Sequence, residues 1–169
     1  MSHYETNLNK NDANYVPLTP LTFLKRAYEI YPNYEALIYE DRKYTWSQVY
    51  KRTVKFASAL NKIGVSKGDT VSFLAFNTPE IFEGHYSVPM TGAVLNTINI
   101  RLDAKTIAYI LEHSEAKVLV VDRQLHVEVK KALNTLKRKI IIIDINDKFA
   151  DQSKCEKIGE LEYESFLNT

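Results

Sequence analysis

Several features that narrow the function of a protein are scarce in these 169 residues. There is one cysteine, Cys155, so no disulfide can form within the chain, which predicts a reducing compartment such as the cytoplasm. The formal net charge of +1 argues against nucleic acid or an anionic membrane as the main partner. No apolar run approaches the roughly 20 residues of a transmembrane helix, and the polar start lacks the core of a secretory signal. We therefore expect a soluble, cytoplasmic protein.

Glycine, histidine and cysteine are too few or too scattered to form a recognisable reactive site. The five glycines never stand as Gly-x-Gly, so neither a Walker-type loop nor a dinucleotide fingerprint is present. The four histidines lack the spacing of a metal site, and Cys155 has no neighbour that would activate it as a nucleophile. We expect Cys155 to be an incidental surface thiol. We expect His85 to pack or to form a local hydrogen bond, and His113 to end a helix.

What the chain does contain is an alternation of amphipathic segments and short apolar runs. The pattern predicts helices at 20–31, 46–63, 79–91, 103–113 and 125–136, a hairpin of 36–39 with 43–46, and apolar strands at 70–76, 93–95, 118–121 and 140–145. Such alternation predicts an α/β fold with a largely parallel sheet flanked by helices. We interpret residues 1–19, which are polar, as a flexible N-terminal arm and 20–169 as the folded domain.

Two helix boundaries are predicted by specific residues. Thr45, with Gln48 three positions later, has the pattern of a capping box, so a helix should begin at Trp46. Thr19 followed by Pro20 should begin the first helix. We expect its inner face to consist of Leu24, Ala27, Tyr28 and Tyr31.

A ligand site, if the domain has one, should lie beyond the carboxyl ends of the parallel strands. The predicted loops at that edge are 77–78, 96–103 and 122–126. In the last of them, Arg123 and His126 are the side chains that could contact an anionic group, and the alternative is an exposed loop without a ligand. From the residues alone, the chain is an α/β domain without an assembled active site.

Motifs in the first hundred residues add a family resemblance. The string YTWSQV at 44–49 resembles the Tyr/Leu-Thr-aromatic-x-Glu-Leu motif of AMP-forming acyl-activating enzymes. Residues 92–99, which begin GAVLNT, resemble the second conserved block of that superfamily. The longer string 85–101 is similar to the fatty acyl-CoA synthetase branch, except that Ile100 stands where that branch has proline. The resemblance runs from about residue 15 to residue 169.

Membership of this family implies an activity that the chain cannot carry out by itself. Such enzymes join a carboxylic acid to AMP from ATP, release pyrophosphate and transfer the acyl group to coenzyme A, with Mg²⁺ as metal ion. They need a Ser/Thr/Gly-rich phosphate loop, an aromatic-x-x-Thr-Glu segment, an aspartate for the ribose and a lysine on a mobile C-terminal domain, and none of these is found here. Without those groups, alignment and charge stabilisation are missing.

The resemblance therefore implies the N-terminal part of a ligase for fatty or other apolar carboxylic acids, incomplete at its C-terminal end. We expect the isolated chain to be inactive, to contain no catalytic residue and to bind neither ATP, Mg²⁺ nor coenzyme A. Within the whole enzyme, we interpret Arg123 and His126 as lining the approach of coenzyme A. The strand at 140–145 should pack against absent sequence, which would leave apolar surface and favour a homo-oligomer.

Two alternatives remain open from the sequence. The chain could be a self-contained, flavodoxin-like binding module, with its ligand at the strand ends. It could also be a non-catalytic interaction or assembly protein derived from the family, acting through its apolar faces.

Overall fold

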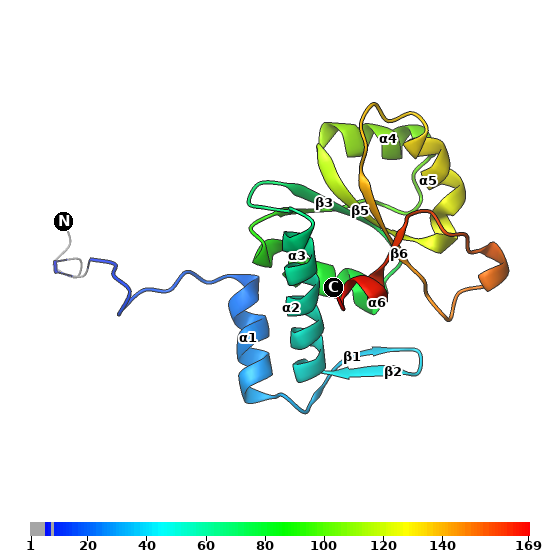
Figure 1. The fold of residues 1–169 in the computed structure, drawn as a ribbon. Coiled ribbons are helices and arrows are strands. Elements are labelled where there is room, and N and C mark those ends of the chain that lie inside the picture. Colours follow the sequence, from blue (N-terminus) through cyan, green and yellow to red (C-terminus); the bar gives the residue numbers. More distant parts are fainter. Residues whose placement is uncertain (1–5, 8) are drawn as a thin grey trace.

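A parallel sheet forms the centre of the computed structural model, which describes residues 6–7 and 9–169 (Figure 1). Among these residues it has five strands, in the order β4-β3-β5-β6-β7. The strands are β3 (Thr70–Leu74), β4 (Val94–Thr97), β5 (Ala116–Asp122), β6 (Ile141–Ile145) and β7 (Leu161–Glu162). Every neighbouring pair is parallel. Counted along the chain within this sheet, the order is 2-1-3-4-5, the flavodoxin-like arrangement, and the predicted α/β class is confirmed.

Helices cover both faces of the sheet, and the sheet separates two clusters of core residues (Figure 1). One face packs against α2 (Trp46–Lys62), α3 (Pro79–Met90) and α6 (Tyr163–Phe166), and the other packs against α4 (Ala104–His113) and α5 (His126–Leu133). Alternate residues of each strand face opposite layers. Phe73 accordingly lies in the first core and Leu74 in the second.

Helix α2 begins and ends where the sequence indicates. The Thr45 side chain accepts from the backbone N–H of Gln48, whose side chain accepts from the backbone N–H of Thr45, so the capping box is present. Apolar residues at helical spacing place Phe56 and Leu60 in the core, each 0% exposed. Gly64 follows the last turn with a φ of +89°, a conformation that glycine adopts without strain.

Helix α3 approaches the sheet closely because it carries a glycine. A Cβ placed on Gly84 would lie 2.6 Å from Cζ of Phe73, well inside van der Waals contact. Phe73 is fully buried and stands edge-to-face against Phe56 of α2. The glycine, which weakens a helix by about 1 kcal/mol, is therefore used here for close packing of α3 on β3.

The N-terminal elements lie beside α2. Helix α1 (Pro20–Ile30) is capped by Thr19 as predicted, buries Leu24 and stacks Tyr28 on Tyr50 of α2 with ring centroids 4.4 Å apart. The expectation that Tyr31 faces inward is wrong, because α1 ends at Ile30 and Tyr31 is 51% exposed.

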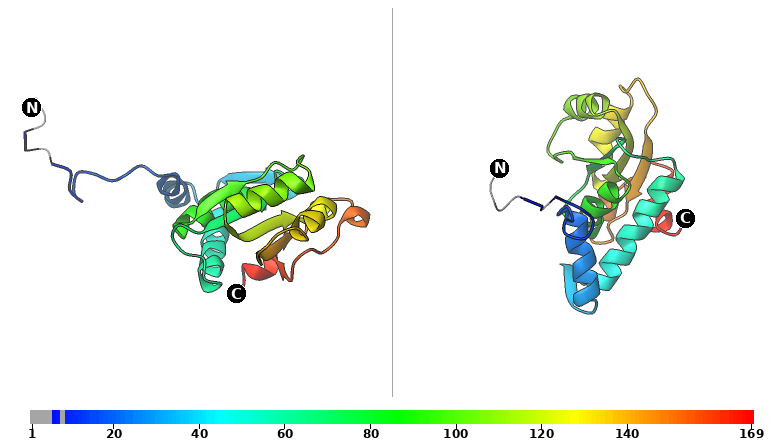
Figure 2. Two further views of the ribbon diagram at one scale, coloured as in Figure 1. Left: turned by 90° about the horizontal axis from the view of Figure 1, so that it is seen from above. Right: turned by 90° about the vertical axis from the view of Figure 1, so that its left-hand side faces the viewer.

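A hairpin and an extended segment complete this end of the molecule. β1 (Glu35–Tyr39) and β2 (Arg42–Thr45) pair antiparallel and apart from the main sheet. Residues 9–19 form no helix or strand, and they run away from α1 (Figures 1 and 2). Residues 1–5 and 8 of the predicted arm lie outside the described residues, and the division at residue 19 stays a prediction.

Strand β6 differs from the expectation of an apolar strand with an uncovered face. Asp144 lies within it and is 0% exposed. Ile143 and Ile145 are buried in the core that includes α6, so these two side chains are not left for absent sequence to cover. Exposed large apolar side chains are most numerous along residues 15–38, on Tyr15, Val16, Leu18, Phe23, Ile30, Tyr31, Tyr34 and Ile38, and others are scattered over the rest of the described chain.

Candidate functional site

The three loops predicted to carry a site do lie at one edge of the sheet. Parallel register aligns the carboxyl ends of β4, β3 and β5, so the predicted loops 77–78, 96–103 and 122–126 lie at the ends of neighbouring strands. The first two residues of the second loop belong to β4, and Asp122 is the last residue of β5. The strand order reverses between β3 and β5, and flavodoxin-like sheets bind their ligands beside that reversal. The junction of β3 with α3 and the end of β5 therefore mark the candidate site.

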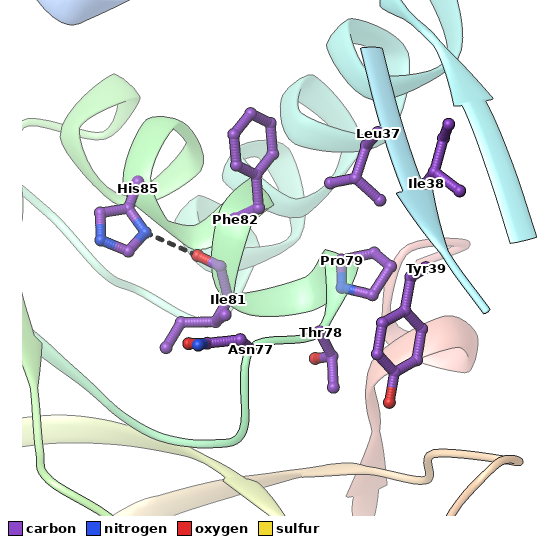
Figure 3. Close-up of a pocket in the computed structure, with 9 residues that line it drawn as sticks. All are labelled: Leu37, Ile38, Tyr39, Asn77, Thr78, Pro79, Ile81, Phe82 and His85. Carbon is purple, nitrogen blue, oxygen red and sulfur yellow. Dashed lines mark hydrogen bonds between the residues drawn. The ribbon is translucent and has the colours of Figure 1, made fainter. Parts of the chain in front are cut away.

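A pocket of about 330 Å³ opens between the hairpin and the start of α3 (Figure 3). Apolar side chains dominate it, and its lining residues are Leu37, Ile38, Tyr39, Asn77, Thr78, Pro79, Ile81, Phe82 and His85. His85 Nδ1 lies 2.8 Å from the carbonyl oxygen of Ile81, and since a carbonyl only accepts, Nδ1 carries the hydrogen. The expected local hydrogen bond of His85 is confirmed.

Buried polar atoms collect beside this pocket at the strand ends. Thr78 Oγ1, Glu80 Oε2 and Asp122 Oδ2 have no hydrogen-bond partner among the described residues, although all three residues are at most 4% exposed. An unmet buried polar group costs about 1–3 kcal/mol. Burial raises the pKa of Asp122, and the negative charges of Asp147 and Glu80 raise it further. This part of the edge is acidic and suits a group that donates hydrogen bonds.

The hairpin is fastened to the same acidic region by two side chains. Arg42 Nη1 donates to Glu80 Oε1 at 2.9 Å, and the Tyr39 hydroxyl donates to Asp147 Oδ2 at 2.5 Å. Burial, and then the hydrogen bond to Asp147, raise the pKa of Tyr39 above its ordinary value. Arg42 therefore supplies a positive charge among carboxylates at this edge.

The two predicted anion-contact residues lie together on the other side of β5. Arg123 is in the 3₁₀ turn η2 (Arg123–Leu125), and His126 is the first residue of α5. His126 Nδ1 donates to the carbonyl oxygen of Arg123 at 3.1 Å. Arg123 Nε donates to Asp144 Oδ2 at 3.1 Å, so a buried carboxylate orients the guanidinium. Their role toward coenzyme A stays a prediction.

Two residues of this region were missed by sequence reasoning. Asp144 accepts hydrogen bonds from Arg123 and from two backbone N–H groups. The feature of the sequence that could have identified it is a single carboxylate within a strand of isoleucines. Glu156 Oε2 lies 3.6 Å from His126 Nε2, while Oε1 accepts from Lys130. The hydrogen bond from Lys130 holds the pKa of Glu156 below its usual value. Glu156 belongs to an irregular segment whose sequence has no periodic signal.

The remaining candidates form no reactive centre. Within residues 6–7 and 9–169, no group of three His, Cys, Asp or Glu side chains could hold a metal ion. Burial raises the pKa of Cys155, as do the charges of Asp122 and Asp151, so its thiol is not activated. His113 ends α4 as expected and stacks on Tyr109. In the described part of the chain, no helix has the length and apolar character to cross a bilayer.

The family model and the named relatives that match this chain agree with one another. The family model described as "AMP-binding enzyme" matches residues 24–165. A peroxisomal trans-cinnamate:CoA ligase of Petunia hybrida is 54% identical over 129 residues, which are 76% of this chain and 23% of that protein. A peroxisomal butyrate–CoA ligase of Arabidopsis thaliana is 45% identical over 169 residues, 95% of this chain and 29% of the relative.

Solved structures share the fold. An anthranilate CoA ligase in complex with anthranoyl-AMP superposes with a TM-score of 0.77 at 24% identity, over 88% of this chain and 27% of that one. A benzoate CoA ligase from Burkholderia xenovorans LB400 gives a TM-score of 0.75 at 21% identity, over 88% and 28%. The chain thus spans between a fifth and a third of the length of these relatives. Because the family model covers most of its residues, the chain belongs to the family of AMP-binding enzymes.

Proposed function

We propose that this chain is the N-terminal part of an AMP-forming acid–CoA ligase. The whole enzyme would activate a carboxylic acid with ATP, release pyrophosphate and pass the acyl group from AMP to coenzyme A. The observation that carries the proposal is the family match over residues 24–165, supported by identities of 45–54% to named CoA ligases. The self-contained flavodoxin-like module shares the strand order, but the family match favours the ligase.

The substrate class we propose is a carboxylic acid with an apolar body. The sequence resemblance indicated fatty acids, and the relatives are named for cinnamate and butyrate, one aromatic and one short acid. Each of these two acids has an apolar carbon skeleton. We therefore include short, aromatic and longer fatty acids in one class.

The experiment that tests the activity is acid-dependent exchange of labelled pyrophosphate into ATP by the full-length protein, followed by thioester formation with coenzyme A. A panel of butyrate, cinnamate, benzoate and longer fatty acids should give exchange with at least one acid. Absence of exchange with every acid, by a folded full-length protein supplied with Mg²⁺, would contradict the proposal. It would favour the non-catalytic assembly alternative.

The role we assign to these 169 residues is that of a scaffold. The residues fold into a sheet with two packed cores but lack the family's phosphate loop and Mg²⁺ segment. The isolated chain should therefore bind ATP negligibly, with or without Mg²⁺. Isothermal titration calorimetry that found micromolar binding of ATP would overturn this assignment.

Self-association of the isolated chain is part of the same proposal, although the surface differs from the one expected. Leu18, Phe23 and Tyr34 are each more than 60% exposed, so apolar contact area lies along the N-terminal elements. Sedimentation velocity should show association that increases with concentration. A compact monomer that does not bind a hydrophobic dye would contradict it.

The compartment is a separate question. A lone cysteine favours a reducing compartment, and we propose the cytoplasm, whereas the two relatives described above are named as peroxisomal. Fluorescence microscopy of the tagged full-length protein separates the two: signal in peroxisomes would overturn the cytoplasmic proposal.

A further inference from the structure

A short segment crosses the region in which Arg123 and His126 lie. This segment, residues 156–159, is called the strap below. Its first residue, Glu156, donates its backbone N–H to the carbonyl oxygen of Arg123 at 3.4 Å. Its last two residues donate their backbone N–H groups to the two carboxylate oxygens of Asp144, at 3.0 and 2.9 Å. The strap is thus tied to η2 at one end and to β6 at the other.

The anchored end of the strap lies directly on β6. A Cβ placed on Gly159 would be 2.6 Å from the carbonyl oxygen of Ile142, so only glycine allows this approach without a shift. Asp144 beneath it is fully buried, and three donors surround its carboxylate. We expect the backbone of the strap to stay in place at both ends, while the exposed side chain of Glu156 can move.

The first residue of the strap, Glu156, places its carboxylate against two basic side chains of α5. His126 and Lys130 are four residues apart on α5, a spacing that places their side chains on one face of the helix, and Arg123 lies in η2 just before it. The carboxylate of Glu156 contacts the two α5 residues, with His126 Nε2 at 3.6 Å and Lys130 donating to Oε1. Arg123 uses Nε for Asp144, which leaves its terminal Nη groups for another acceptor.

We propose that Glu156 is an internal anion that stands in the place of a phosphate group, and that a phosphorylated ligand displaces it from His126 and Lys130. The inference rests on the proposed function, in which this face lies on the approach of coenzyme A. A phosphate monoester carries a charge of about −1.5 to −2 and three acceptor oxygens, whereas a carboxylate carries one charge and two oxygens. The ligand group can therefore engage Arg123 together with the two cations that Glu156 contacts.

The displacement requires little rearrangement. The Glu156 side chain is 60% exposed, so moving it into water opens no cavity. The Asp144 anchor and the Arg123 guanidinium that it orients remain as they are. Glu156 then acts as a competitor that lowers the affinity for phosphate without affecting the fold. Because exposed ion pairs are weak, removal of the Glu156 carboxylate should strengthen binding of the phosphate group only modestly, by roughly two- to fivefold.

The test compares Glu156→Gln with Glu160→Gln in the full-length protein. Glu160 is exposed directly after the strap and makes no side-chain hydrogen bond or ion pair among the described residues, so it is the matched control. The dissociation constants of inorganic pyrophosphate and of coenzyme A are measured by isothermal titration calorimetry. Glu156→Gln should lower both, and Glu160→Gln should leave both unchanged. Unchanged or weaker binding by Glu156→Gln would overturn the proposal.

Two further arms identify the group that binds and separate this inference from the proposed function. If the gain occurs with coenzyme A but not with dephospho-coenzyme A, the 3′-phosphate displaces Glu156; if it occurs with both, the diphosphate does. Adding Lys130→Ala should abolish the gain, because the contact that Glu156 blocks would be gone. The full-length protein could show no ligase activity while the Glu156→Gln variant still binds pyrophosphate more tightly than the wild type. That result would refute the proposed function and support the displaceable carboxylate.

Discussion

Arg52 on α2 and Glu83 on α3 form the most deeply buried ion pair that joins two helices in the described chain, with Nε 2.5 Å from Oε1. Glu83 is 1% exposed and also accepts from the hydroxyl of Tyr163 at 2.8 Å. Arg52 donates in addition to both carboxylate oxygens of Glu164. This network joins α6 to the two long helices, so it fixes the position of the last helix on the sheet.

Replacing Arg52 by alanine should lower the free energy of unfolding by about 3 kcal/mol or more. Removal of one partner leaves the carboxylate of Glu83 buried without its cation, which is the costly way to break such a pair. Urea unfolding followed by circular dichroism measures the loss. Lys51→Ala, at an exposed neighbouring position on α2, is the control and should change stability by less than about 0.5 kcal/mol. Equal stability of the two variants would contradict the argument.

The same pair predicts a pH dependence of stability. Burial raises the pKa of Glu83 from 4.5 to about 7, although Arg52 and Tyr163 both favour the ionised form. The folded chain therefore holds this proton more tightly than the unfolded chain does. The contribution of Glu83 is fully present below about pH 4.5 and is lost as the pH rises through 7. Relative to Glu83→Gln, the wild-type chain should lose stability between pH 5 and pH 8.

Urea unfolding of both chains at several pH values measures that difference. Asp103→Asn provides a control of opposite sign, because the hydrogen bond from the Thr106 backbone lowers the pKa of Asp103. The stabilising effect of Asp103 is lost only as the pH falls through its lowered pKa, below the range tested. A difference between wild type and Glu83→Gln that stays constant from pH 5 to pH 8 would be evidence against a raised pKa.

The elements that the sequence predicted well are those whose signals are local. The capping box of Thr45 and Gln48 and the helical spacing of apolar residues identified α2 from its own residues. The carboxyl-edge loops followed from the alternation of strands and helices, because parallel strands must end at one edge. For the same reason the sequence predicts that Arg123 and His126 lie at that edge, beyond the end of a strand.

The features that the sequence did not predict depend on contacts between distant segments. Arg52 and Glu164 are separated by 112 positions, and no local pattern links them. Asp144 was hidden within an isoleucine strand, and its partners at residues 123, 158 and 159 come from two different segments. Tyr31 was misplaced because the helical spacing continues one residue further than α1 does. Long-range pairing, rather than helix or strand propensity, decides these positions.

Gly84→Ala should destabilise the chain, although alanine is the better helix former. The added methyl group would meet the ring of Phe73 at 2.6 Å, and overpacking of this kind costs about 1–3 kcal/mol. The double variant Gly84→Ala/Phe73→Leu makes room for the methyl group and should recover part of the loss. A double-mutant cycle in urea gives the coupling between the two positions. Additive effects would show that the close approach of α3 to β3 does not determine the cost.

Two threonines that precede helices should respond differently to substitution. Thr45 accepts from the N–H of Gln48, so Thr45→Ala should cost about 1 kcal/mol. Thr78 precedes α3 in the same way but makes no side-chain capping bond, and its buried hydroxyl has no partner among the described residues. Thr78→Val should therefore be neutral or stabilising. Thermal unfolding compares the variants, and a larger loss at Thr78 than at Thr45 would show that its hydroxyl is engaged.

Coenzyme A recognition gives the most direct test of the candidate site. In the full-length enzyme, His126→Ala and Arg123→Ala should together raise the KM for coenzyme A about tenfold or more while kcat changes little. The reason is that charge-assisted hydrogen bonds contribute about 1.5–3 kcal/mol each. Lys137→Ala, exposed beyond the far end of α5, is the control. Arg123→Ala also leaves the carboxylate of Asp144 buried without its cation, so His126→Ala alone must raise the KM in a protein of normal stability. If the paired variant has an unchanged KM for coenzyme A, the two residues do not line its approach.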